Sequence, residues 1–517
     1  MIHSYFNHFI MPYADKNFIS RSLMPAFKYF FAGVLLSFIL FHSPAPVSAA
    51  EPARLSGKYK DCNVILIILD ALRPEHLSCY GYPEKTSPNI DALAERGVIF
   101  SGAFSTAPYT MPAVASIFTS LYPYSHNMMD AFKDGLSDNI YTLAQIFDIY
   151  GYNTVWFGGL SDPHSGSAMG MLNGFRSKYN LHQIGQISSN TLSDVPRWIN
   201  KNSRGKFFLT VHSYLTHEQF FPFLRADNKF HRRVPEEFTN ELESLRRSAE
   251  LNFSKGLFIN SMEEKEESVR LYSAWADKAF RFIDRLDKDR LREFLSLLDS
   301  AVYEVDQRLI GGIVAELKNK GIYDKTIIVI TADHGNEFKE HGSFGHGAYL
   351  YDESIRVPLV YYLPGLNRGI RVDPLVQSID TLPTLLDLLS IPVPEQAQGR
   401  SLVGLLEDKS RYPAREFVFS QGVNNIFSIR SDKWKYIRGI KCPPKGGQEP
   451  YEHLFDLQND RPEKDDLIVS RPETAWMLRD RLERWQKDLV RYNKEEREFP
   501  VDIPEETRKR IKKTGYW

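Results

Sequence analysis

The clearest pattern along the chain is a set of short apolar runs, two of which end in an aspartate. NVILIILD (Asn63–Asp70) and TIIVITAD (Thr326–Asp333) are nearly unbroken stretches of Ile, Leu and Val. Such runs are typical of central strands that are buried on both faces of a parallel sheet. Further strands are expected at NTVWF, KFFLTVHS and PLVYYL, which are residues 153–157, 206–213 and 358–363.

Segments with a three-to-four-residue apolar period lie between these runs. In TSPNIDALAERGVIF, Ser87 and Pro88 indicate a helix start, and Gly97 is expected to cap the helix end. YTLAQIFDIY and YEVDQRLIGGIVAELKNKG show the same helical pattern. The alternation of strands and helices predicts an α/β sandwich, with a large, mostly parallel sheet between helices.

This fold class predicts the positions of two aspartates that follow strands. Asp70 and Asp333 each follow a predicted strand. Because parallel strands end at one edge of a sheet, and ligands bind at that edge, both aspartates are expected to lie there together.

The N-terminal segment has the order of a signal peptide. Arg21 and Lys28 precede the apolar run FFAGVLLSFILF (Phe30–Phe41), and small residues follow near Ala50. The run is shorter than the roughly 20 residues that a spanning helix needs. We therefore expect residues 1–50 to be a cleaved leader and the protein to be exported, periplasmic or extracellular; an uncleaved anchor is the alternative.

Composition divides the rest of the chain. Residues 51–400 carry the strand and helix alternation, interrupted at 228–294 by a charged helical insertion that is either a solvated helix pair or a lid. Residues 401–517 contain short alternating strands and an amphipathic helix, which predicts a small α+β subdomain. Lys and Arg (64) balance Asp and Glu (65), so nothing indicates a nucleic-acid partner.

FSTAPYTMPAVASIF (residues 104–118) resembles an active-site turn that leads into a helix. Two prolines bracket the tripeptide Tyr-Thr-Met, and its middle residue, Thr110, occupies the place where a catalytic nucleophile would be expected. Together with the blocks FFLTVHSYLTH, IIVITADHGNEFKEHGSFGHGAYLYDESIRVPLVYY and IRSDKWKYI, this segment resembles the sulfatases of the alkaline-phosphatase superfamily.

The resemblance implies a site around one divalent metal. By analogy, Asp70, Asp333, His334 and the nucleophile Thr110 are metal ligands. His217 matches the histidine that contacts the ester oxygen, and His346 matches a position near the leaving group, so either is a candidate general acid. Two further histidines, His212 and His341, are candidates for a supporting role next to these residues.

Three departures from the family pattern change the expected chemistry. The Cys/Ser-x-Pro-x-Arg signature reads Thr110-Met111-Pro112-Ala113-Val114, so no formylglycine is expected. The second acidic ligand after the first strand is replaced by Ala71. FGGLSDPH (residues 157–164) stands where the family has a Lys and a His.

These residues predict an exported, metal-dependent hydrolase of phosphate or sulfate esters that uses Thr110, with phosphorus esters preferred because threonine cannot form an aldehyde hydrate. The first alternative is a sulfuric ester hydrolase for an aryl or glycan sulfate. The second is an inactive sulfatase-fold binding protein. The expected cofactor is one Ca²⁺, Mn²⁺ or Zn²⁺ ion, the substrate is a small-molecule, glycan or lipid ester, and a membrane is involved only if the leader stays uncleaved.

Overall fold

The computed structural model describes most of the chain after the predicted leader. The leader and most of the predicted insertion at 228–294 lie outside the described residues, so both stay predictions. In the part that is described, no helix has the length and apolar character to cross a membrane. The described residues are 54–129, 134–158, 170–180, 191–217, 230, 240, 244, 281–407, 412–439 and 451–492.

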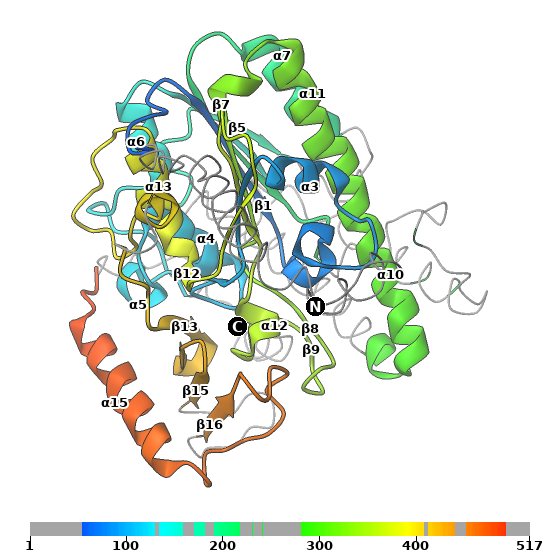
Figure 1. Ribbon diagram of the computed structural model, residues 1–517, viewed down its shortest axis with the longest axis vertical. Helices are drawn as coiled ribbons and strands as arrows, with labels where there is room; N and C mark the ends of the chain where they lie inside the picture. The colour runs from blue at the N-terminus through cyan, green and yellow to red at the C-terminus, as the bar shows by residue number, and fades with distance from the viewer. Residues whose placement is uncertain are drawn as a thin grey trace, which may run out of the picture. The chain divides into compact units, whose positions relative to one another are not determined.

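An eight-stranded sheet forms the centre of the fold (Figure 1). Its central strand β1 pairs in parallel with β6 and with β7, and every residue of β1 is buried. The nearly continuous apolar run is explained by this double coverage, and the predicted fold class is confirmed. In spatial order the strands are β11 (Ile370–Val372), β2 (Gly97–Phe100), β10 (Leu359–Tyr362), β7 (Thr326–Thr331), β1 (Asn63–Leu69), β6 (Phe207–Ser213), β4 (Asn153–Gly158) and β5 (Ser177–Asn180).

One side of the sheet departs from the parallel pattern. Strand β10 runs antiparallel to both of its neighbours, β7 and β2. Gly97, which the sequence pattern indicated as a helix cap, is instead the first residue of β2. A Cβ at Gly97 would lie 2.3 Å from the carbonyl oxygen of Tyr361 on β10, so this glycine is required by the close approach of the two strands.

Helices cover both faces of the sheet. Ser87 is the N-cap of α3 and Pro88 its first residue, as the sequence predicted. Thr142 and Gln145 form a capping box at the start of α6. Figure 1 shows one helical group, α3 (Pro88–Ala94), α7 (Asp194–Asn202), α10 (Lys288–Val305) and α11 (Gly311–Asn319), on one face, and a second, α4 (Thr110–Thr119), α6 (Leu143–Ile149) and α13 (Thr381–Leu388), on the other.

The C-terminal part forms a second, smaller sheet. Its four antiparallel strands are covered by α15 (Pro472–Asp488), whose residues Ala475, Leu478 and Leu482 pack on the sheet. A C-terminal α+β subdomain is therefore present, although its predicted start at residue 401 stays a prediction. The strands are β13 (Val418–Gly422), β14 (Ile426–Arg430), β15 (Trp434–Gly439) and β16 (Tyr451–Asp456).

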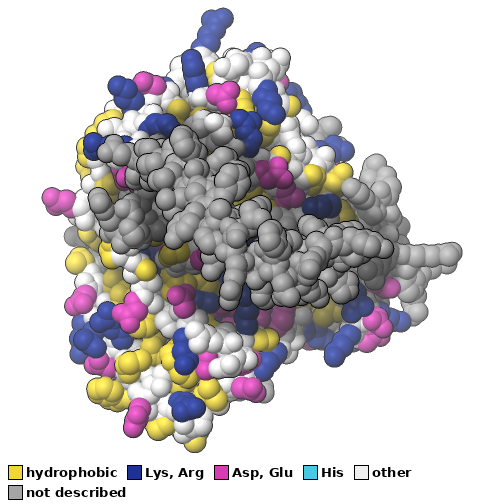
Figure 2. All heavy atoms as spheres, in the orientation of Figure 1, with side chains coloured by type: hydrophobic (Ala, Val, Ile, Leu, Met, Phe, Trp, Pro, Cys, Tyr) yellow, Lys and Arg dark blue, Asp and Glu magenta, His cyan; other side chains and the backbone are white. Residues whose placement is uncertain are grey.

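Two short elements connect the large sheet to the loops of its carboxyl edge. Strand β3 (Ala103–Phe104) leads into α4, and helix α12 (Asp352–Ile355) follows the hairpin of β8 (Glu337–Phe338) and β9 (Phe344–Gly345). Among the coloured residues on the face shown in Figure 2, basic and acidic side chains are interspersed.

Candidate active site

Three neighbouring parallel strands bring two carboxylates and an imidazole together. Ile68 of β1 is in register with Thr331 of β7 and with His212 of β6. The chain then turns, so that Asp70 and Asp333 follow β1 and β7 at the same edge, as predicted. Donor atoms of Asp70, His212 and Asp333 all lie within 4.8 Å of one another, and all three residues are buried.

The two carboxylates have different surroundings. Asp333 Oδ1 accepts the backbone N–H of Ala71 at 3.2 Å and that of His334 at 2.9 Å. Burial alone would raise the pKa of Asp333, but the His334 and His212 imidazoles and the Ala71 N–H hold it below its ordinary value. Asp333 Oδ2 and Asp70 Oδ1 accept no hydrogen bond from any described residue.

His334 connects this cluster to the candidate nucleophile. Its Nδ1 lies 2.8 Å from the carbonyl oxygen of Gly335, so Nδ1 carries the proton and donates it. Its Nε2 then accepts the hydroxyl of Thr110, whose Oγ1 is 3.2 Å away. Nε2 is also 3.7 Å from Asp70 Oδ1 and 3.5 Å from Asp333 Oδ2. A lone pair that faces two carboxylates is unfavourable unless a positive charge lies between them.

This donor set fits a divalent cation. Two buried carboxylate oxygens without hydrogen bonds, two imidazoles and a hydroxyl converge at the end of three strands. Buried carboxylates that lack hydrogen bonds are costly, and a cation removes that cost. Asp70, His212, Asp333 and His334, together with Thr110, are therefore the residues that would hold the ion. Oxygen and imidazole donors in one set suit Mn²⁺ or Zn²⁺ and also admit Ca²⁺.

Ala71 shows how the site keeps its shape without a second acid. Its backbone has φ 56°, a left-handed conformation that costs energy for a residue other than glycine. This conformation turns the Ala71 N–H toward Asp333 Oδ1. In this chain, position 71 thus contributes a backbone donor that orients Asp333, while His212 contributes an additional imidazole.

Two more histidines lie beside the cluster. His217, which follows β6, and His346, which follows β9, have their Nε2 atoms 2.9 Å apart. One of these nitrogens donates a proton to the other, because two lone pairs could not approach so closely. The His346 ring also lies against the His334 ring, with centroids 4.2 Å apart. The predicted acid candidates therefore share one buried hydrogen bond next to the nucleophile.

The pH dependence of the metal-free protein follows from His212. Burial lowers the pKa of His212, but its contacts with Asp333 and Asp70 outweigh burial and raise the pKa from 6.5 to about 9. The protonated ring thus contributes stability that is fully present below pH 6.5 and is lost as pH rises through 9. We expect the Tm of the metal-free protein to decrease as the pH is raised from 6.5 to 9. The Tm of the His212→Gln variant should decrease less over the same pH range. A wild-type Tm that falls no more steeply than that of His212→Gln would contradict this assignment.

Of the two histidines predicted to have a supporting role, His341 has its contacts outside the carboxylate–imidazole cluster, and His212 is part of it. His341 stacks on Tyr351 with centroids 3.5 Å apart and has its Nε2 3.6 Å from Glu353. His212, predicted only as a supporting residue, lies directly between the two aspartates, 3.4 Å from Asp70 Oδ2 and 3.6 Å from Asp333 Oδ2. His212 lies near the end of a predicted strand, as Asp70 does, and this position was the signal that could have indicated a place in the cluster.

A cation site at the carboxyl edge of a mostly parallel sheet, with a hydroxyl beside it, defines an ester hydrolase of the alkaline-phosphatase superfamily. The chain belongs to the sulfatase family: the family model described as Sulfatase matches residues 62–391. A second model, described as N-sulphoglucosamine sulphohydrolase, C-terminal, matches residues 339–488. Sulfatases bind a divalent metal, which agrees with the donor set found here.

The chain is similar over most of its length to proteins that are named as sulfatases. Arylsulfatase K of Gallus gallus is 27% identical over 481 residues, which cover 86% of this chain and 85% of that protein. Delta 4,5-hexuronate-2-O-sulfatase of Bacteroides thetaiotaomicron is 23% identical over 430 residues, 78% of this chain and 84% of that protein.

Solved structures share the fold. A 2-O GAG sulfatase superposes with a TM-score of 0.63 at 22% identity, over 83% of this chain and 93% of that chain. The phosphonate monoester hydrolase of Agrobacterium radiobacter superposes with a TM-score of 0.58 at 21% identity, over 82% of this chain and 95% of that chain.

Proposed function

We propose that the chain is a metal-dependent ester hydrolase that uses the Thr110 hydroxyl as its nucleophile, without conversion to formylglycine. The observation that carries this proposal is the position of Thr110 Oγ1, 3.2 Å from His334 Nε2 in the carboxylate–imidazole cluster. Thr110 is also the first residue of α4, where the positive end of the helix favours a substrate oxyanion.

The residues around Thr110 suit a two-step displacement. Thr110 Oγ loses its proton to solvent and attacks the central atom of the ester, and the bond to the leaving oxygen breaks. Water then attacks the same atom, its bond to Thr110 Oγ breaks, and the threonine oxygen takes a proton back. The pair His217–His346 supplies the proton that the leaving oxygen needs. A bound divalent cation supplies positive charge that lowers the pKa of a nearby hydroxyl and neutralises the ester oxygens.

The nucleophile favours phosphorus esters. Formylglycine releases sulfate by collapse of its hydrate, so that water never attacks sulfur on the enzyme. Oxidation of threonine would give a ketone, because its Cβ carries a methyl group, and Val114 replaces the arginine of the maturation signature. A threonyl ester must therefore be hydrolysed by attack of water on its central atom. Water attacks phosphorus in such an ester more readily than it attacks sulfur.

A sulfate ester of a glycan is the second candidate, and the relatives favour it. Arylsulfatase K and the hexuronate-2-O-sulfatase are both sulfatases, and they match the chain over most of its length. In this case Thr110 would form a sulfated intermediate that water attacks.

A substrate panel separates these functions. Purified protein is assayed with p-nitrophenyl phosphate, p-nitrophenyl phenylphosphonate and p-nitrophenyl sulfate, with Mn²⁺, Zn²⁺ or Ca²⁺ supplied. We expect the phosphorus esters to be turned over at least about tenfold faster than the sulfate, which is about 1.4 kcal/mol in barrier height. Turnover of the sulfate alone would establish the second candidate. No turnover of any of them, together with no bound metal, would favour a binding protein with the sulfatase fold.

A further inference from the structure

Helix α12 is too short to be stable by itself. It has only four residues, Asp352–Ile355, whereas isolated helices of far greater length are marginal in water. Its N-cap residue, Tyr351, makes no side-chain capping bond. Instead, Glu463 of the C-terminal subdomain accepts the N–H of Asp352 through Oε2 at 2.6 Å. The start of α12 is therefore capped by a carboxylate from 111 residues further along the chain.

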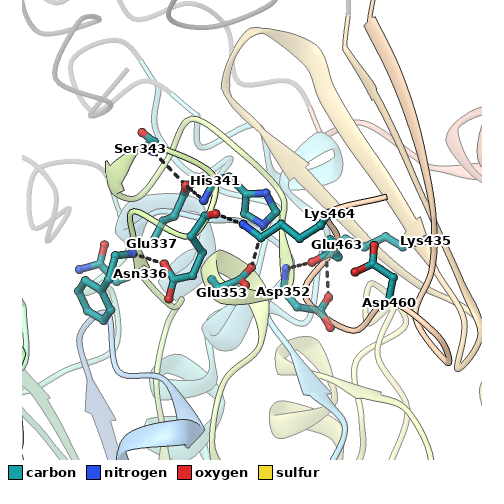
Figure 3. A network of polar contacts seen from close by, with 12 residues as sticks. Asn336, Glu337, His341, Ser343, Asp352, Glu353, Lys435, Asp460, Glu463 and Lys464 are labelled. Atoms are coloured by element: carbon teal, nitrogen blue, oxygen red, sulfur yellow. Dashed lines mark hydrogen bonds and ion pairs between the residues drawn. The ribbon is translucent and has the colours of Figure 1, made fainter. Parts of the chain in front are cut away.

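A buried ammonium group completes this connection (Figure 3). Lys435 Nζ, on β15, lies 2.9 Å from Asp352 Oδ1 and 2.8 Å from Glu463 Oε1. The side chains of Lys435 and Glu463 are both 0% exposed. Arg430 adds a second cation, 3.1 Å from Asp352 Oδ2. We call Lys435, Glu463 and Asp352, whose side chain is 13% exposed, the buried triad. Removing one partner of a buried ion pair leaves the other charge uncompensated, so each member of this group depends on the others.

The opposite side of α12 contacts the metal-binding turn. The N–H of Gly335, the residue after His334, donates to Ser354 O at 2.9 Å. A Cβ at Gly335 would lie 2.1 Å from Glu353 O, so the backbones of the turn and the helix are in direct contact. A displacement of α12 would therefore be transmitted to Gly335, whose carbonyl oxygen sets the tautomer of His334.

The end of α12 also contacts the segment that leads to the nucleophile. Ile355 O accepts the N–H of Ser105 at 2.7 Å, and the N–H of Val357 donates to Ala103 O at 3.0 Å. Ser105 precedes Thr110 by five residues. One short helix thus lies between the C-terminal subdomain, the metal-binding turn and the nucleophile segment.

We propose that the buried triad positions the metal site: by fixing α12, it holds the His334 turn and the Thr110 segment in register. The role of Thr110 in this statement rests on the proposed function, whereas the effect on metal binding does not. Lys435, Asp352 and Glu463 are positioning residues, because they act through α12.

The test measures metal affinity directly. Mn²⁺ alone is titrated into metal-free full-length Lys435→Met by calorimetry, and no substrate is present. We expect the Kd to rise about tenfold, the size typical of residues that orient metal ligands. The matched control is Arg479→Met, since Arg479 on α15 pairs with Glu452 of the same small sheet, away from α12. Its Kd should stay within about twofold of wild type.

A second variant keeps the test decisive if Lys435→Met does not fold. Glu463→Gln retains one oxygen that can accept the Asp352 N–H, but it replaces the oxygen that faces Lys435 Nζ with an amide group. Because the cap of α12 is kept, we expect a smaller rise in Kd, about threefold. A folded Lys435→Met or, failing that, Glu463→Gln with the wild-type Kd would overturn the proposal. A protein that hydrolyses no ester but shows these Kd changes would reject the proposed function and retain the triad.

Discussion

Replacing Thr110 with alanine is expected to lower kcat/KM for the preferred ester by about 10⁴-fold or more, because the nucleophile is lost. Thr110→Ser keeps the hydroxyl and should stay within about 100-fold of wild type. Initial rates with the p-nitrophenyl ester identified by the substrate panel provide the measurement. Rapid quenching followed by mass spectrometry should also detect the threonyl ester on Thr110 of the wild-type protein. The Thr110→Ala variant should show no such adduct.

A matched control lies in the same helix. Thr119, near the end of α4, is also buried, and its hydroxyl donates to Ala115 O at 2.7 Å. Thr119→Ala removes the same atoms and should leave kcat/KM nearly unchanged. If Thr110→Ala retained wild-type activity while Thr110→Ser offered no advantage over it, Thr110 could not be the nucleophile.

Asp333→Asn is expected to weaken divalent metal binding by about 100-fold or more, because one of the two carboxylate charges in the cluster is lost. The asparagine oxygen can still accept the N–H groups of Ala71 and His334, so the fold should be retained. The metal content of the purified protein, measured by mass spectrometry, and the Mn²⁺ Kd provide the readouts. Hydrolysis should fall in parallel and should not be restored by added metal at micromolar concentration.

Asp380 offers the comparison for this variant. Its carboxylate is equally buried, but it accepts hydrogen bonds from Arg415 Nη2 at 2.7 Å and from Gln377 N at 2.8 Å. Asp380→Asn should lower the Tm while metal content stays at the wild-type level. Equal metal loss in both variants would indicate a general effect of destabilisation and not a ligand role for Asp333.

The central part of the fold could be read from local sequence. The run at residues 63–70 is apolar at nearly every position because β1 is buried on both faces, and this made its type and place clear. From there, the meeting of Asp70 and Asp333 followed from strand direction alone. The antiparallel direction of β10 could not be predicted, because a short buried run looks the same in either direction.

The remaining features depend on contacts between distant residues. Gly97 is required by the backbone of Tyr361, and the role of His212 depends on its register with Ile68. The buried triad joins residues 83 and 111 positions apart, and no local pattern distinguishes Lys435 from an exposed lysine. Side chains whose function comes from tertiary neighbours are therefore found only once the strands and loops are in place.

The donors of the candidate cation site come from segments that are far apart in the sequence. Asp70 and Asp333 are 263 positions apart in the sequence, so neither of their strands can form the site alone. Any ion that this site binds would be loaded after folding, because the site is incomplete until β7, the last of its three strands along the chain, has been synthesised. An ion held by this site would be acquired in whichever compartment the chain folds, and the metals abundant there would decide which one it is.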